Sequence, residues 1–489
     1  MRKIWVLLLF ITLAVYGYGQ KLNALLSYNT YCTDQLEPYI EFTFLIDGQS
    51  VKYVANENGK YQAGVKIDIS LERKDTVVKK LDFLLLSDEF ADSVRSEKPD
   101  FADKQNILIP NGEYFIRFSV KDTNSDAQPF VYLDHAVIAF PPERVSMADV
   151  TLLNKLMPQE DDNNVFNKYG FCMIPLFHNY VPEEIMALPF YTEIYNTEKI
   201  LGYDNSFIVR SYIEHTSDRR LASPQLISEK MLKTAPVSIF LNQFNVYNLP
   251  SGNYNLVLEV MDKDSNNLLT AKTFFQRSNP RMKLNIETYN NTDVDNTFVS
   301  KITDLKTMQD YIGSLYPIAN AVEQEFFVTR MKTIPLDKLQ RFFYSFWLTR
   351  NPSDPEGEWE KYKAKVDYVQ QAYGSKQVKG FRTDRGRVYL QYGPPNQITE
   401  APYDPQSYPY EIWHYYNMGE QNNIRFVFYN PDLISNDYEL LHSDALGEPK
   451  DTSWQLKLTK RLNIQYDPDI KKPDSYWGGS LDEDWLYGR

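Results

Sequence analysis

The spacing of apolar residues changes near residue 282, and this change divides the chain into two kinds of structure. Between residues 20 and 281, short runs such as Tyr39–Ile46 and Gly64–Arg73 are rich in β-branched and aromatic residues, which indicates strands. After residue 282 apolar residues recur every three or four positions, which indicates helices. The chain is therefore expected to be multidomain, with a β-rich part followed by a helical segment and a small C-terminal α+β domain.

One motif within the β-rich part occurs twice. The segment Ile109–Ser125 (IPNGEYFIRFSVKDTNS) aligns without a gap on Leu249–Ser265 (LPSGNYNLVLEVMDKDS). In each copy a Pro-x-Gly turn precedes a strand whose tyrosine, Tyr114 or Tyr254, could bond back to the backbone across a sandwich corner. The repeat predicts two immunoglobulin-like β-sandwiches, over residues 20–147 and 148–281.

Residues 282–375 are expected to form a helical segment. Apolar stripes at helical spacing run through Leu305–Leu315 and Leu336–Trp347. A third stripe, from Trp359 to Tyr373, alternates spacings of three and four, and Gly374 follows as a C-terminal cap. These stripes are expected to form a core rather than to bind a cofactor.

Residues 376–460 are expected to form a small sheet domain. Three runs have strand-like composition, namely Gly386–Gly393, Tyr410–Tyr416 and Ile424–Asn430. Alternation would place Val388, Leu390 and Tyr392 of the first run on one face.

The last segment, residues 461–489, is acidic and rich in aromatic side chains. It carries Trp477, Trp485 and Tyr487, which are costly to leave exposed to water. These three residues are therefore candidates for binding a partner protein.

The N-terminus has the pattern of a signal peptide. Positive charge at Arg2 and Lys3 precedes a short apolar run, Ile4–Val15, and small residues follow before Gln20. This pattern predicts a signal peptide over residues 1–19 with cleavage before Gln20. Because the run is shorter than the ~20 residues of a membrane span, we expect an exported protein without a transmembrane span, periplasmic or associated with the outer membrane.

The charge limits the classes of partner, and the cysteine content limits the number of disulfides. Without the signal peptide the chain has 50 basic residues against 65 acidic ones, hence a formal charge of −15. This charge disfavours binding to nucleic acid and to anionic lipid. Cys32 and Cys172 are the only cysteines, so one disulfide is possible in an oxidising compartment, and the sequence leaves their pairing open.

The stretch Lys379–Pro395 (KGFRTDRGRVYLQYGPP) resembles the motif of the GWxTD-domain proteins, a family of exported proteins from Bacteroidota and related bacteria. In that motif a helical stretch is followed by Gly-Trp-x-Thr-Asp, Arg-Gly, a strand, Gly-Pro-Pro and a later strand containing Trp. Here Phe381 stands in the place of the family's first Trp. The resemblance covers about residues 335–460 and implies β-sandwich modules before the named domain, but no generally accepted reaction. The matching residues are Gly380, Thr383, Asp384, Arg385, Gly386, Gly393, Pro394, Pro395 and Trp413.

The sequence contains no reactive constellation, so no catalytic residue is predicted. Thr383 and Asp384 are adjacent on a chain expected to be extended, where their side chains would point to opposite faces. They are expected instead to bond the backbone of a turn ending at Gly386, while Gly380 permits tight backbone geometry and Phe381 anchors the preceding helices. The motif is thus interpreted as a structural joint between helices and sheet. The five histidines lie in separate segments without metal-ligand spacing, so neither metal nor cofactor is expected.

Two functions are compatible with these features. The first is a non-enzymatic exported scaffold or accessory protein of the bacterial envelope, in the periplasm or in an outer-membrane complex, that binds other envelope proteins. The alternative is a carbohydrate-binding or carbohydrate-processing module, suggested by the 36 Tyr and 7 Trp, which would bind a glycan. An exposed groove with two or three coplanar aromatic rings, or a pair of facing carboxylates, would favour the alternative.

Overall fold

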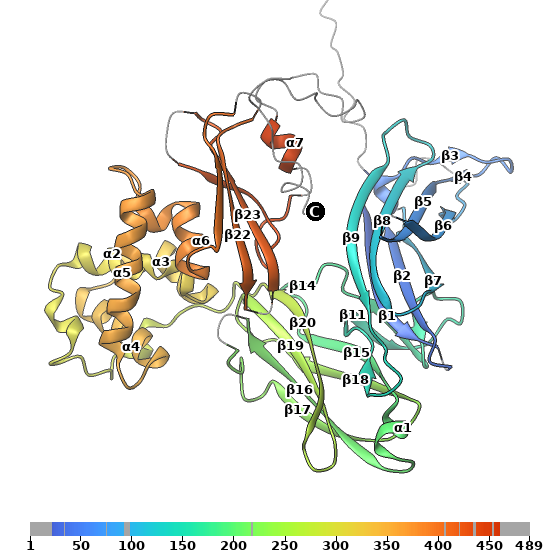
Figure 1. The fold of residues 1–489 in the computed structure, drawn as a ribbon, viewed down its shortest axis with the longest axis horizontal. Helices are drawn as coiled ribbons and strands as arrows, with labels where there is room; N and C mark the ends of the chain where they lie inside the picture. The colour runs from blue at the N-terminus through green and yellow to red at the C-terminus, as the bar shows by residue number, and fades with distance from the viewer. Residues whose placement is uncertain are drawn as a thin grey trace, which may run out of the picture. The chain divides into compact units, whose positions relative to one another are not determined.

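The computed structural model describes residues 22–459 except 34, 75, 92–97, 217–218, 405–406, 420, 434–436 and 452–453. The chain divides into two compact units. The first unit comprises Met1–Tyr247 and Tyr254–Phe275, and the second comprises Asn248–Asn253 and Gln276–Arg489. The first is made of β-sheets, whereas the second combines helices with one sheet (Figure 1).

The first half of the first unit contains two antiparallel sheets that pack face to face. One has the strand order β1-β2-β7 and the other β6-β5-β8-β9. Inward-facing side chains of the two sheets meet, as in the edge-to-face pair of Phe42 and Phe118, whose ring centroids are 5.5 Å apart. The strands are β1 (Ala24–Cys32), β2 (Pro38–Ile46), β5 (Gly64–Arg73), β6 (Thr76–Leu86), β7 (Phe101–Leu108), β8 (Gly112–Asp122) and β9 (Phe130–Ile138), with a small hairpin of β3 (Val54–Ala55) and β4 (Tyr61–Gln62).

The second half of this unit contains two further sheets. A six-stranded sheet has the order β10-β15-β11-β13-β12, with β18 on the other edge of β15, and a five-stranded sheet has the order β14-β20-β19-β16-β17. A hydrogen bond of 3.3 Å from Asn242 on β18 to Ser211 on β16 joins the two. The elements are β10 (Ser146–Met147), β11 (Thr151–Pro158), β12 (Asn167–Lys168), β13 (Phe171–Pro175), β14 (Tyr180–Val181), β15 (Ala187–Tyr195), α1 (Thr197–Leu201), β16 (Ser206–His215), β17 (Ile227–Lys233), β18 (Val237–Asn245), β19 (Gly252–Met261) and β20 (Asn267–Arg277).

The two copies of the repeated motif have the same local structure. Each forms a strand, β8 or β19, that ends in an Asx turn in which the aspartate Oδ1 accepts the backbone N–H two residues on, at 2.9 Å in both Asp122 and Asp262. The buried Tyr114 donates to the carbonyl of Pro110 at 2.9 Å. Its counterpart Tyr254 is also buried, where it stacks on Phe275.

Both cysteines are buried and free, so they do not form a disulfide. Burial is the main reason that the pKa of the Cys32 thiol rises to about 12. Because the thiolate is the nucleophilic form, burial disfavours reaction of Cys32 as a nucleophile at neutral pH.

The second unit begins with a helical bundle and ends in a sheet that helices flank. All three expected helices are present, as α2, α4 and α5. None of the helices within the described residues is long and apolar enough to cross a membrane. The helices are α2 (Leu305–Ser314), α3 (Ala321–Thr329), α4 (Leu336–Arg350), α5 (Pro355–Tyr373), α6 (Asp384–Tyr392) and α7 (Trp454–Thr459).

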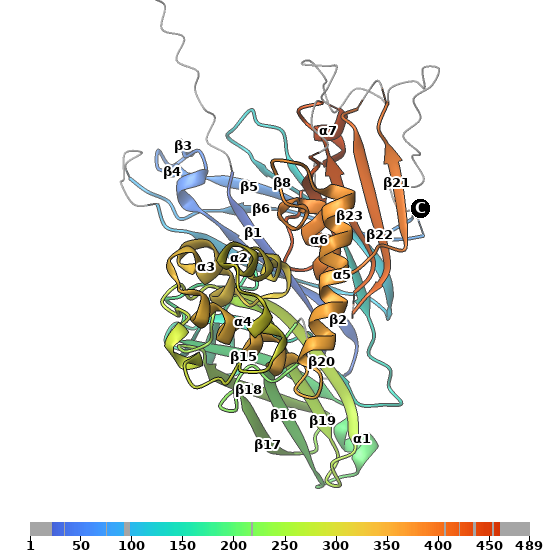
Figure 2. The ribbon, with the colours of Figure 1, turned by 90° about the vertical axis from the view of Figure 1, so that its left-hand side faces the viewer.

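The sheet of this unit is antiparallel, with the order β21-β22-β23-β24. Its strands are β21 (Gln397–Ala401), β22 (Tyr410–Met418), β23 (Gln421–Tyr429) and β24 (Glu439–Ser443). Trp413 on β22 packs with Val388 of α6 on one face, whereas Ile412 packs with Trp454 of α7 on the other. Figure 2 shows α5 and α6 beside this sheet.

The expectation of a strand over Gly386–Gly393 is wrong, because this segment forms the helix α6. Val388 and Leu390 are both buried, but they enter different cores: Val388 joins the sheet core, and Leu390 joins the helical core. A helix covered on two sides buries residues that lie two positions apart, so its apolar pattern imitates a strand. Thr383 before the helix and Gly393 with two prolines after it are the usual signals of helix ends, and they could have indicated the helix.

Candidate functional site

The motif residues before and at the start of α6 lie in very close contact with other backbone segments. A β-carbon on Gly386 would lie 1.9 Å from the carbonyl oxygen of Gly380. One on Gly380 would lie 2.2 Å from the carbonyl oxygen of Val369 in α5. The turn Gly380–Arg382 is therefore wedged between α5 and the first turn of α6, and only glycine fits at these two contacts.

Thr383 caps the N-terminus of α6. Its Oγ1 accepts the backbone N–H of Gly386 at 3.1 Å and donates to the carbonyl of Gly380 at 2.8 Å. The side chain is 4 % exposed, and both hydrogen-bonding roles of the hydroxyl are satisfied within the protein. The cap satisfies one of the helix N–H groups that have no intrahelical partner.

Replacing Thr383 by alanine is expected to lower the free energy of unfolding by about 1 kcal/mol, the usual effect of losing an N-cap. Tryptophan fluorescence during urea unfolding will measure this, because the four tryptophans among the described residues, Trp347, Trp359, Trp413 and Trp454, lie in the second unit. Thr383→Ser keeps the hydroxyl and is expected to behave as the native protein does. An alanine variant of native stability that has lost its function would instead place Thr383 in an active site.

Asp384 and Gly393 join α6 to the sheet at its two ends. Asp384 Oδ2 accepts the backbone N–H of Leu440 on β24 at 2.7 Å, and as the first residue of α6 its negative charge suits the helix N-terminus. Gly393 has φ +84°, a left-handed conformation that favours glycine, and its carbonyl accepts from Tyr415 at 2.8 Å. Pro394 and Pro395 follow, and the chain then enters β21.

A buried ion pair lies at the centre of the motif. Arg385 Nη1 is 2.5 Å from Glu411 Oε1 on β22, and Arg385 is 4 % exposed. The other oxygen of Glu411 accepts the indole N–H of Trp413 at 3.0 Å. Rings of Tyr373 and Tyr438 lie 5.0 Å and 4.2 Å from the guanidinium carbon, as in cation–π contacts.

The sequence indicated Arg385 and Trp413 but not Glu411, the residue that connects them. Glu411 lies two positions before Trp413 on β22, so the two side chains share one face of the strand. That alternation, with a buried arginine needing an anion, is the signal that could have found it.

Phe381 packs in the helical core, as expected for an anchor. It is buried, and its ring lies against α2, where a β-carbon on Gly313 would be 3.5 Å from it. Arg382 places its guanidinium carbon 5.7 Å from the same ring.

A second buried polar group in this unit ties the end of β24 to the segment before α7. His442 Nε2 is 3.2 Å from Asp444 Oδ1, and its Nδ1 accepts the backbone N–H of Asp451 at 3.1 Å. Arg425 Nε donates to the other oxygen of Asp444 at 2.8 Å. His442 stacks on Trp454, so both nitrogens and one ring face are occupied within the protein.

Asp444 is expected to make the second unit sensitive to acid. Burial favours its neutral form, but hydrogen bonds from His442 and Arg425 outweigh burial and lower the pKa of Asp444 to about 2. Because this pKa lies below the unfolded value of about 4, the carboxylate stabilises the fold above pH 4, and this stabilisation is lost as the pH falls from 4 to 2.

Asp444→Asn should therefore lower the free energy of unfolding by about 2–3 kcal/mol at pH 7. The difference between variant and native protein should shrink as the pH falls toward 2, as measured by urea unfolding at each pH. A difference that does not depend on pH would show that the charge of Asp444 is not the cause.

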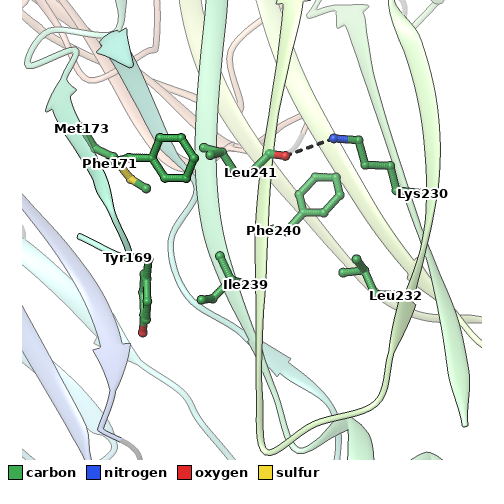
Figure 3. Close-up of a pocket in the computed structure, with 8 residues that line it drawn as sticks. All are labelled: Tyr169, Phe171, Met173, Lys230, Leu232, Ile239, Phe240 and Leu241. Carbon is green, nitrogen blue, oxygen red and sulfur yellow. Dashed lines mark hydrogen bonds between the residues drawn. The ribbon is translucent and has the colours of Figure 1, made fainter. Parts of the chain in front are cut away.

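The three residues predicted to bind a partner, Trp477, Trp485 and Tyr487, lie outside the described residues. Among the residues that the structure describes, no three His, Cys, Asp or Glu side chains gather where they could hold a metal ion. A groove of about 390 Å³ lies in the first unit, between β13, β17 and β18 (Figure 3), away from the motif in the sequence.

Comparison with known families identifies the motif-bearing part of the chain. Residues 287–455 match the family model described as the GWxTD domain. The chain therefore contains a GWxTD domain, and this domain includes the helical bundle as well as the sheet. It begins well before residue 335, where the motif-based expectation placed its start.

Comparison with whole proteins gives only weak similarities. No curated protein sequence matches the chain. Among solved structures, red sea bream transglutaminase aligns at 8 % identity over 53 % of this chain and 31 % of its own, with a TM-score of 0.17. A DUF3823 family protein from Bacteroides ovatus aligns at 10 % identity over 46 % and 95 %, with a TM-score of 0.15. Trypsin-activated alpha-2-macroglobulin from Escherichia coli aligns at 10 % identity over 53 % and 16 %, with a TM-score of 0.16. The chain thus spans less than a third of the transglutaminase and of the macroglobulin, and these scores support no argument about fold or function.

Proposed function

We propose that this protein is a non-enzymatic scaffold or accessory protein that is exported to the bacterial envelope and binds other envelope proteins. The observation that carries the proposal is the arrangement of the motif. Thr383, Asp384 and Arg385 each bond another element of the same unit, so their polar groups join α6 to its neighbours. A catalytic group needs instead to reach a substrate.

The architecture supports a binding role. We propose that each pair of sheets in the first unit is an immunoglobulin-like β-sandwich. In the first pair the corner tyrosine Tyr114 bonds the backbone four residues upstream, as corner tyrosines do, and in the second pair the equivalent Tyr254 is buried. Modules of this kind present edges and loops to partners on a rigid framework. The signal-peptide pattern over residues 1–19 supports export to the periplasm or to the outer membrane.

The carbohydrate alternative has less support. The groove of the first unit has three aromatic rings, from Tyr169, Phe171 and Phe240, but its remaining lining is aliphatic apart from Met173 and Lys230. Sugar recognition needs several hydrogen-bonding side chains next to the rings, and here only Tyr169 and Lys230 carry polar side-chain groups.

Co-purification tests the proposal. The tagged full-length protein, expressed in its native cells, is expected to recover a defined set of envelope proteins after gentle solubilisation. Deletion of residues 475–489, or alanine at Trp477, Trp485 and Tyr487, is expected to reduce that recovery. Unchanged recovery from the deletion variant would exclude the tail as the binding segment. If the native protein recovers no partner, the scaffold function is wrong.

A further inference from the structure

We infer that the free edge of β18 is a binding site for an extended strand of a partner protein, which adds to the sheet beside β18. The inference deepens the proposed function, because it rests on that function and assigns the partner a place and a chemistry. The pairing of β18, the groove along this strand and the position of Lys230 support the inference.

Within the described residues β18 is an edge strand. All nine of its residues, Val237–Asn245, pair with β15 on one side, and no strand of the described part of the chain pairs with it on the other. An unpaired strand edge presents a row of backbone N–H and C=O groups that can pair with another chain.

The direction of these groups is fixed by one hydrogen bond. Lys230 on β17, a strand of the other sheet, donates from Nζ to the carbonyl of Leu241 at 3.1 Å. The carbonyl of Leu241 therefore points away from β15. Because N–H and C=O of one residue point to the same side of an antiparallel strand and alternate along it, the N–H groups of Ile239 and Leu241 also face the free edge.

A groove of about 390 Å³ follows this edge and has apolar walls on both sides of the strand. On one side Leu241 lies beside Phe171 and Met173, and Ile239 lies beside Tyr169 (Figure 3). On the other side Phe240 lies toward Leu232. An added strand would place alternate side chains into the two halves of the groove, as in other complexes formed by strand addition.

The apolar wall is open to solvent. Tyr169, Phe171 and Ile239 are 50 %, 37 % and 40 % exposed. Covering them would remove apolar surface from water and so favour binding.

Charge indicates which strand fits. Lys230 is exposed and is the one charged residue among the described residues that line the groove. In a second copy paired antiparallel about Leu241, two Lys230 ammonium groups would meet near the two-fold axis and repel each other. A partner strand with alternating apolar residues and an Asp or Glu beside Lys230 has no such cost.

The site can be tested with a library of random nonapeptides displayed on phage, selected on the full-length protein. The expected selection is of sequences that alternate apolar residues and carry one acidic residue. A synthetic copy of a selected peptide should bind at least tenfold more weakly when its alternate amides are N-methylated. A selection without binders, or peptides that bind equally well after N-methylation of either set of alternate amides, would overturn the inference.

Variants of the protein locate the site. Ile239→Pro removes an outward N–H without removing a bond to β15 and should weaken peptide binding at least tenfold, whereas Ile239→Val keeps the N–H and should bind as the native protein does. Lys230→Glu should weaken binding of the acidic peptide at least tenfold, and Lys230→Arg should not. Equal binding by Ile239→Pro, with a native unfolding curve, would place the peptide elsewhere.

The same variants separate this inference from the proposed function. If envelope proteins are recovered equally by the native protein and by Ile239→Pro, the scaffold function remains and the strand edge is excluded as its interface. If the native protein recovers none, the proposed function fails, and the peptide experiments still decide whether the edge binds strands.

Discussion

Replacing Gly386 by alanine is expected to lower the free energy of unfolding of the second unit by about 3 kcal/mol or more. The added β-carbon would lie 1.9 Å from the carbonyl oxygen of Gly380, and Gly380 itself rests on the backbone of α5. A backbone oxygen held between two helices cannot move aside as a flexible side chain can, so the cost should exceed that of ordinary overpacking. Urea unfolding followed by tryptophan fluorescence measures it.

Gly313→Ala is the matched control. Its β-carbon would meet only the ring of Phe381, at 3.5 Å, which is an ordinary van der Waals distance. Since alanine favours a helix by about 1 kcal/mol over glycine, and Gly313 lies near the end of α2, this substitution should be neutral or slightly stabilising. If Gly386→Ala and Gly313→Ala have similar effects, the close packing of α5, the turn and α6 is not the reason for glycine at position 386.

Replacing Arg385 by methionine is expected to cost about 3–5 kcal/mol, since it leaves the buried carboxylate of Glu411 without its cation. The arginine is nearly inaccessible, and its guanidinium lies between aromatic rings, so water cannot replace the lost partner. Equilibrium unfolding in urea at pH 7 measures the loss.

A double substitution separates the charge from the packing. Glu411→Gln keeps an acceptor for the indole N–H of Trp413 and removes the negative charge. Combined with Arg385→Met, it should therefore restore at least about 1 kcal/mol relative to Arg385→Met alone. If the effects of the two substitutions on the free energy of unfolding add to within about 0.5 kcal/mol, Arg385 and Glu411 are not energetically coupled. The ion pair then does not stabilise the unit.

Both predictions concern the free energy of unfolding and not the rate of a reaction, because the proposed function is non-enzymatic. A variant that loses partner binding is informative only when its unfolding curve is native. Ile239→Val and Thr383→Ser are useful in this respect, because each keeps the backbone and hydrogen-bonding groups of its position.

Much of the local structure could be predicted from the sequence. The strands β2, β5, β8, β22 and β23 and the helices α2, α4 and α5 lie close to their expected positions, because their apolar periods are clear. The repeated motif also indicated the strands β8 and β19 and the corner tyrosine Tyr114, which bonds the backbone of Pro110. These features depend on interactions within a few residues, which a single sequence contains.

The function of the motif residues was predicted in outline but not in detail. Thr383 was expected to bond a turn ending at Gly386, and it does bond that residue, but as the cap of a helix rather than in a turn before a strand. Asp384 was assigned to the same turn, yet its partner is Leu440. The pattern of polar residues predicted that Thr383 and Asp384 act as caps. It could not predict that Asp384 bonds a residue 56 positions away.

What the sequence by itself determined is therefore the change from strands to helices, the repeated β motif and the glycine and threonine positions of the joint, since these follow from backbone preference and apolar period. The tertiary structure alone decided that α6 is a helix, that Glu411 joins Arg385 to Trp413, that the two cysteines stay apart and that, among the described strands, only β15 pairs with β18. Each of these depends on which distant segments lie next to one another. The helix α6 lies between two cores, so its apolar residues alternate as they would in a strand. No local preference in the sequence shows that two cores meet there.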